Sequence, residues 1–263
     1  MNQPPVKQSL SPHPVLPAHY AAEEDRVGYI RGLFDRTAES YDRINAWMSL
    51  NRGEHYRMEA MVRAGVHEGQ WVLDCACGTG VMAAHAQRLV GTSGVVVAID
   101  PSLPMLAVAG TRGVQNRVSG TAERLPLPDA SVDVVTMGYA LRHVADLGVA
   151  FAEFARVLRP GGRLLILEMV PPRSPVGHLL AKLYLKHLVP TLASWLGGSG
   201  DARRLMQYYW DTVDQCVAPG VVIDALQDAG FVSVARSVKL ALLTEYTAIV
   251  STTTDPDSGL SGF

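Results

Sequence analysis

Hydrophobic positions in this chain alternate between short β-branched runs and longer stretches with helical spacing. Residues 71–75, 94–100 and 132–137 have the length and composition of buried strands. A helical pattern follows each of them along the chain, and the last, around residues 147–157, precedes a further strand at 163–169. Strands that alternate with helices of ten or more residues predict an α/β fold, with a mostly parallel sheet and helices on both faces.

Three weaker runs complete the predicted sheet. A short strand is expected at 114–118, and two strands are expected near 231–238 and 240–250, after a helix at 220–228. The short spacing between the last two strands indicates an antiparallel hairpin. We therefore expect a Rossmann-like sheet of seven strands, mostly parallel, whose last strand is antiparallel.

Changes in composition divide the chain into segments. Residues 1–20 contain five prolines and few apolar residues, so we expect a disordered arm there. Residues 21–66 carry helical patterns and form a predicted helical N-terminal lobe. Residues 67–250 form the main domain, in which 171–218 interrupt the alternation as a substrate-side insertion. The polar tail 251–263 is predicted to be disordered.

Composition narrows the class of protein. The 263 residues are 48% hydrophobic, and 23 basic residues against 25 acidic ones give a net charge of -2, without the basic footprint of a nucleic-acid binder. Three cysteines suit neither a disulfide framework nor a zinc site, so we expect no metal and a cytoplasmic location. The apolar and basic segment 178–196 is read either as a membrane-peripheral helix or as an ordinary half-buried helix. The sequence leaves open whether the chain forms a homodimer.

The most informative stretch is the turn from Asp74 to Gly80, which reads Asp-Cys-Ala-Cys-Gly-Thr-Gly. Its glycines let the backbone approach a nucleotide-like ligand closely, and the spacing also satisfies a dinucleotide fingerprint. The acid distinguishes the two readings, because a carboxylate repels a pyrophosphate and attracts a cation. Asp74 therefore favours S-adenosylmethionine (SAM), which carries an ammonium and a sulfonium. A nicotinamide dehydrogenase is the rival reading.

In open α/β sheets, ligands bind beyond the carboxyl ends of the strands, so further candidates follow each strand. Asp100 could accept both ribose hydroxyls or cap the next helix. The turn around Thr121 could read an adenine edge or be only a turn. The residues expected at these strand ends to bind the cofactor are Asp74, Gly78, Thr79, Gly80, Asp100, Pro101, Met105, Thr121 and Ala122.

The loop after strand 132–137 holds the candidates for chemistry. Tyr139 could offer a π face to a sulfonium, and His143 could act as a general base near neutral pH. Arg142 and His143 are the predicted catalytic residues. The structural alternatives are that Tyr139 is core, that Arg142 pairs with an acid such as Glu168, and that His143 caps a helix. The aromatic run 208–210 could line an aromatic substrate's pocket or pack in the core.

Several motifs together resemble the ubiquinone/menaquinone biosynthesis C-methyltransferases of the UbiE type. These motifs are Tyr41 to Ser49, Asp74 to Gly80, Ala122 to Asp129, Leu141 to Val144 and Arg156 to Arg163. The resemblance implies SAM contacts for Thr79, Asp100, Thr121, Ala122 and Gly138, closure of Tyr41 over the methionine end, and help from Arg142 in deprotonating a quinol. The chain departs from the family pattern at Gly53, Tyr56, Thr121, Gly138, His143 and Met206.

These features predict a SAM-dependent methyltransferase that transfers a methyl group to an electron-rich aromatic small molecule. A quinol-type ring methylated on carbon is the first expectation. O-methylation of a phenolic specialised metabolite is the alternative, for which His143 would suffice as base. A SAM-binding scaffold that no longer methylates is an alternative of another class.

Overall fold

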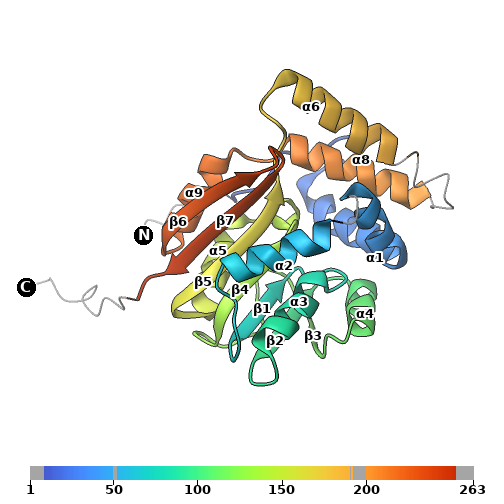
Figure 1. Cartoon of the computed structure of the whole chain (residues 1–263). Coiled ribbons are helices and arrows are strands. Elements are labelled where there is room, and N and C mark those ends of the chain that lie inside the picture. Colours follow the sequence, from blue (N-terminus) through green and yellow to red (C-terminus); the bar gives the residue numbers. More distant parts are fainter. Residues whose placement is uncertain (1–8, 50–51, 190, 192–199, 253–263) are drawn as a thin grey trace, which may run out of the picture.

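A seven-stranded sheet forms the centre of the computed structural model, which describes residues 9–49, 52–189, 191 and 200–252 (Figure 1). The strand order is β3-β2-β1-β4-β5-β7-β6. Among the described strands, β7 runs in the opposite direction to the other six. The predicted fold is thus confirmed. The strands are β1 Trp71–Cys75, β2 Val95–Asp100, β3 Asn116–Ser119, β4 Val132–Gly138, β5 Leu158–Met169, β6 Phe231–Lys239 and β7 Leu243–Val250.

Helices cover both faces of the sheet and its carboxyl edge (Figure 1). They are α1 Glu23–Met48, α2 Gly53–Arg63, α3 Val81–Val90, α4 Leu103–Thr111, α5 Leu147–Val157, α6 Pro175–Lys182, α8 Gly200–Asp214 and α9 Pro219–Asp228. A 3-10 turn, η1, spans Leu141–His143, and a π-helix, η2, spans Leu183–Leu188 directly after α6. None of the helices in the described ranges is long and apolar enough to cross a membrane.

Alternating side chains of each central strand point into two separate cores. On β1, Leu73 and Cys75 pack with α5 and α9, while Val72 packs with α2 and α3 on the other face. Both sets are fully buried, as the two-residue period of a strand covered on both faces requires. Asp74 therefore lies in the middle of the sheet, between Ala98 of β2 and Thr136 of β4.

A third core joins the N-terminal segment, α1, η2 and α8. Leu16 and Tyr20 are buried in it, at 2% and 6% exposure. The expectation of a disordered arm is therefore wrong for residues 9–20, because two large apolar side chains among the prolines have a place to pack. Residues 1–8 of that arm and 253–263 of the expected tail lie outside the described residues.

Several boundaries differ from those expected; β3 and β7, for example, begin at Asn116 and Leu243 rather than at 114 and 240. Strand β5 begins at Leu158 rather than Arg163, because Pro160 to Gly162 form an irregularity within the strand: Val132 pairs with Leu158, and Val134 pairs with Arg163. The helix expected over 178–196 begins earlier, at Pro175, and turns into η2. Residues 190 and 192–196 of that stretch lie outside the described part.

Candidate active site

The carboxyl ends of β1 and β4 enclose a cavity of about 440 Å³. The chain crosses from one half of the sheet to the other between these neighbouring strands, which is where open α/β sheets bind their ligands. Loops after β1, β2 and β4 form its floor, and α1 covers it. The cavity is therefore the candidate active site.

The two glycines of the loop after β1 have different roles. Gly78 has φ +55°, and no atom lies within 4 Å of where its Cβ would be, so it keeps the cavity floor open. Gly80 has φ +77°, and its Cβ would lie 2.7 Å from the Cβ of Ala109, so it lets α3 pack against α4. Gly80 is not among the lining residues. The structure therefore gives it a packing role where we expected a cofactor contact.

Alanine at these two positions should separate packing from binding. Both sites have positive φ, which costs an L-residue about 1 kcal/mol. Only Gly80→Ala adds a clash with Ala109, so we expect it to lower the free energy of unfolding by about 3 kcal/mol, against about 1 kcal/mol for Gly78→Ala. Urea unfolding measures this difference. Equal losses for the two variants would contradict the packing role.

Asp74 is a buried carboxyl group with one free oxygen. Its Oδ1 accepts a hydrogen bond from Thr136 Oγ1 at 2.9 Å, and its Oδ2 has no hydrogen-bond partner within the described residues. Burial raises the pKa of Asp74 to about 7, against the opposing effect of the Thr136 bond. A buried, unpartnered carboxylate oxygen is costly unless a cation approaches it. The site thus fits a ligand that carries an ammonium group.

Asp100 organises the loop and still faces the cavity. Its Oδ2 accepts from the Gly78 amide at 2.8 Å, and its Oδ1 accepts from the Ser102 amide at 2.9 Å. The N-cap of α4 is Ser102, whose Oγ accepts a hydrogen bond from the Met105 amide. The capping role considered for Asp100 therefore belongs to Ser102, two residues further along the chain. Burial raises the pKa of Asp100 to about 6. Each oxygen keeps a lone pair for a ligand hydroxyl.

The structure brings together nearly all of the predicted site residues. A Cβ at Gly138 would collide with Met82 Sδ, so a side chain at this position would require Met82 to move. Gly80 and Arg142 are the two predicted site residues that do not line the cavity. Those that do are Tyr41, Asp74, Gly78, Thr79, Asp100, Pro101, Met105, Thr121, Ala122, Gly138 and His143.

Arg142 lies behind the cavity wall in an ion pair. It is fully buried, its Nη1 donates to Glu168, and its Nε donates to Thr212 Oγ1 at 3.1 Å. Its guanidinium lies 4.0 Å from the ring centroid of Tyr209. Burial alone would lower the pKa of Arg142, but the Glu168 carboxylate keeps it above its usual value. The ion-pair alternative is confirmed, and Arg142 is not among the residues that line the cavity.

His143 lines the cavity as a neutral imidazole. Burial, with a contribution from the Arg142 cation, lowers its pKa well below the usual 6.5. Its Nδ1 lies 3.2 Å from Tyr208 Oη, and the two rings stack with centroids 5.4 Å apart. Phe34 meets the same imidazole edge-on at 5.2 Å. The aromatic run 208–210 is buried in the third core and is not part of the lining, which confirms the packing alternative.

Sequence reasoning missed the helices that cover the cavity. Val27, Ile30 and Phe34 of α1 line it, and nothing in their helical spacing distinguishes this role from packing against the sheet. Arg57 of α2 also lines it and lies 4.7 Å from the ring centroid of Tyr139. That cation lies over one face of the Tyr139 ring. Periodicity shows that a helix has an apolar face, but not which surface it covers.

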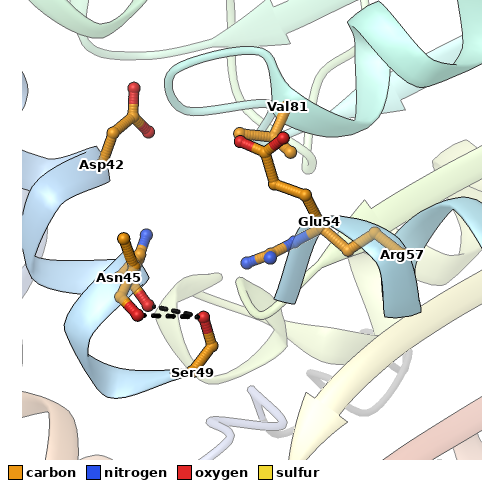
Figure 2. Close-up of a pocket in the computed structure, with 7 residues that line it drawn as sticks. Asp42, Asn45, Ser49, Glu54, Arg57 and Val81 are labelled. Atoms are coloured by element: carbon orange, nitrogen blue, oxygen red, sulfur yellow. Dashed lines mark hydrogen bonds between the residues drawn. The ribbon is translucent and has the colours of Figure 1, made fainter. Parts of the chain in front are cut away.

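A smaller polar cavity of about 300 Å³ adjoins the first (Figure 2). Figure 2 shows Glu54 and Arg57 of α2 across from Asp42 and Asn45 of α1. Asp42 accepts hydrogen bonds from Thr79 Oγ1 and from Arg112 Nη2, both at 2.6 Å. These bonds fasten α1 to the loop after β1 and to the end of α4, so that the helix stays over the cavity.

Solved structures with the same fold include SAM-dependent methyltransferases. One is from Aquifex aeolicus (TM-score 0.56, 21% identity, 80% of this chain and 97% of that one). A possible histamine N-methyltransferase from Thermotoga maritima has a TM-score of 0.58 at 22% identity, with 83% of this chain and 98% of that one covered. The fold class is therefore that of Rossmann-like SAM-dependent methyltransferases.

Sequence comparison then identifies the family. The profile of the ubiE/COQ5 methyltransferase family matches residues 20–243, and the chain belongs to this family. It is 32% identical over 218 residues to the demethylmenaquinone methyltransferase of Symbiobacterium thermophilum, with 80% of this chain and 87% of that protein covered. It is 33% identical over 220 residues to UbiE of Escherichia coli O1:K1, with 81% and 86% covered. The chain is thus a SAM-dependent methyltransferase of the UbiE type, and the predicted resemblance is confirmed.

Proposed function

We propose that this enzyme methylates a ring carbon of a quinol-type aromatic small molecule. The observation that carries the proposal is the composition of the cavity. The buried acids Asp74 and Asp100 lie on its floor, while apolar side chains of α1 and the neutral His143 line it as well. A cationic nucleoside and a flat apolar acceptor have complementary chemistry to these two sets of residues. Relatives at 31–33% identity are named as ubiquinone or menaquinone biosynthesis methyltransferases.

The donor end is assigned to residues on the cavity floor. SAM, when bound, supplies a methyl group that a nucleophile can displace from sulfur. We assign the ammonium to Asp74 Oδ2, the ribose hydroxyls to Asp100, and the adenine to Thr121 and Ala122, which line the same cavity. Tyr41 lies beside Phe34, with ring centroids 5.8 Å apart, and covers the cavity from α1. These groups orient the donor and exclude water.

The acceptor end is assigned to Phe34, His143 and Val144, which line the cavity. In our proposal, His143 Nε2 takes the proton of the acceptor hydroxyl. The electron pair left on oxygen conjugates with the ring, so the adjacent carbon becomes the nucleophile that takes the methyl group. That carbon must then lose its own proton, and the electron pair of the broken C–H bond restores the aromatic ring. The role of His143 as base needs the tautomer in which Nδ1 carries the proton and donates it to Tyr208 Oη. Tyr208 is thereby a positioning residue for the base.

Two substitutions test this pair. His143→Asn keeps a polar side chain without a base and should lower kcat about 100-fold. Tyr208→Phe removes the partner of Nδ1 and should lower kcat about tenfold at unchanged KM for SAM. Steady-state kinetics measure both. If Tyr208→Phe changes only thermal stability and leaves kcat intact, the positioning role is wrong.

The pH dependence of wild-type turnover provides a further readout of His143. A base must be deprotonated to act, and the pKa of His143 lies well below 6.5. At pH 6.5 the base should therefore still be deprotonated. The decrease of kcat on the acid side of the profile should have its midpoint below pH 6.5. A limb centred at 6.5 or above would contradict a desolvated histidine as the base.

O-methylation remains the second candidate, because a base next to a hydroxyl can also activate the oxygen. A matched pair of acceptors separates the two reactions. The first is a reduced naphthoquinone whose ring carbon beside the hydroxyl is free, and the second has that carbon blocked by a methyl group. Carbon methylation predicts turnover of the first alone, whereas turnover of both identifies an O-methyltransferase. No turnover of any quinol or phenol would favour the non-methylating scaffold.

A further inference from the structure

Five large apolar side chains lie exposed in a row on α6 and η2. Four of them are spaced along α6 and the start of η2 as one face of a helix requires. The fifth lies five residues after Leu183, and a π-helix, which bonds i to i+5, brings residues five apart toward one side. The α6 apolar face consists of Val176 (69% exposed), Leu179 (55%), Leu180 (61%), Leu183 (49%) and Leu188 (50%).

The opposite side of the same segment anchors it to the protein. Leu185 and Val189 are buried at 1% and 2% exposure in the core shared with α1 and α8. Figure 1 shows α6 on the outer side of α8, at the edge of the molecule. The α6 apolar face therefore points away from the fold over about 18 Å. Single exposed leucines are ordinary, but a row of five marks an interaction surface.

The charges around this face have one sign. The sequence contains no acidic residue between Glu168 and Asp201, in a chain whose net charge is -2. Arg173 and Lys182 are exposed and form no ion pair with the described residues. An apolar row flanked by cations is the pattern of a helix that lies in the interface of an anionic membrane.

Other charges near this segment belong to α8. Lys186 Nζ lies 2.6 Å from Asp211 Oδ1, and His178 Nε2 lies 2.6 Å from Asp214 Oδ1. These pairs fasten α6 and η2 to the protein and leave Arg173 and Lys182 as the cations available to a partner. A second copy of the chain would be a poor partner, because a two-fold contact would bring like charges together.

We infer that the α6 apolar face docks on the surface of an anionic lipid bilayer, with its leucines in the headgroup region and Arg173 and Lys182 on lipid phosphates. This surface lies outside the cavity. The inference is independent of the acceptor's identity. It gives the enzyme a place beside lipids through a surface helix.

Vesicle sedimentation of the full chain tests the inference. Wild-type protein should bind vesicles of phosphatidylcholine with phosphatidylglycerol, and bind far less to phosphatidylcholine alone or in high salt. The double variant Leu180→Ser, Leu183→Ser should lower the partition coefficient at least about tenfold. Lys182→Gln should lower it about fivefold. Leu240→Ser is the matched control, because Leu240 is 88% exposed on the β6–β7 turn and should leave binding unchanged.

Several outcomes would overturn the inference. Wild-type protein that binds neither kind of vesicle contradicts it, as does a double variant that binds like wild type. A dimer by light scattering that becomes a monomer in the double variant would assign the face to a second copy. Thermal melting and turnover of a short-chain, water-soluble acceptor should stay unchanged in the double variant, so loss of vesicle binding is separable from failure of the proposed chemistry.

Discussion

Asp74→Asn should weaken SAM binding about 100-fold or more. The carboxylate is 1% exposed, and its Oδ2 has no partner among the described residues, so in our account the ligand's ammonium provides the missing cation. Removing one member of a buried charge pair costs about 2–5 kcal/mol of affinity. Isothermal titration calorimetry with SAM measures the change directly.

The same substitution should stabilise the ligand-free protein. The folded-state pKa of Asp74, about 7, lies above the ordinary 3.8, so the folded state binds more protons than the unfolded state between these values. The contribution of Asp74 to stability therefore falls as the pH rises from about 4 to 7. At 1.36 kcal/mol for each pKa unit, the loss is on the order of 4 kcal/mol. Asp74→Asn should reduce this loss.

One control variant serves both the SAM-affinity and the stability prediction. Asp129→Asn changes an exposed carboxylate and should alter neither SAM affinity nor the pH dependence of stability by more than a few tenths of a kcal/mol. If Asp74→Asn bound SAM as tightly as the wild type, the assignment of the ammonium to Asp74 would be wrong.

Glu168→Gln should destabilise the protein by about 3–5 kcal/mol. The carboxylate pairs with Arg142, and both side chains are almost completely buried, at 2% and 0% exposure. Glutamine keeps the size of the side chain and an accepting oxygen, but it carries no charge. The Arg142 guanidinium is then buried without a counter-charge, and this uncompensated charge destabilises the folded state. Urea unfolding, with the slope checked for constancy, measures the loss.

Removing both charges should restore most of that stability. The variant Arg142→Met, Glu168→Leu replaces the pair by apolar side chains, and we expect it to unfold within about 2 kcal/mol of the wild type. The two single substitutions would then be strongly non-additive. Additive losses, or a loss below about 1 kcal/mol for Glu168→Gln alone, would show that the pair does not stabilise the wall behind the cavity.

The strands and the acids that follow them could be predicted because their signals are local. Asp74 and Asp100 come at the ends of apolar runs, and parallel strands end at one edge of a sheet. The fold class follows from the same alternation. Tyr41 and His143 belong to motifs of a family whose membership the profile match confirms, and both line the cavity.

What could not be predicted depends on contacts between distant segments. Gly78 and Gly80 look alike in the sequence, and only the approach of Ala109 distinguishes an open floor from a helix contact. The proline-rich arm reads as disordered until α1 and α8 provide a core for Leu16 and Tyr20.

The sequence left two roles open for Arg142: catalysis, or an ion pair with an acid such as Glu168. Choosing between them required the neighbouring strand β5, which places the acid beside the guanidinium behind the cavity wall. Sequence patterns identify chemically capable residues, and tertiary packing decides which of them face the ligand.

The most direct test of the proposed function uses SAM labelled with ¹³C on the methyl group. The protein, labelled SAM and a reduced polyprenyl naphthoquinone with a free ring carbon are incubated together, and the product is examined by NMR. We predict a single labelled methyl group attached to that ring carbon. A labelled methyl group on oxygen, or no label in the quinol, would contradict the proposal.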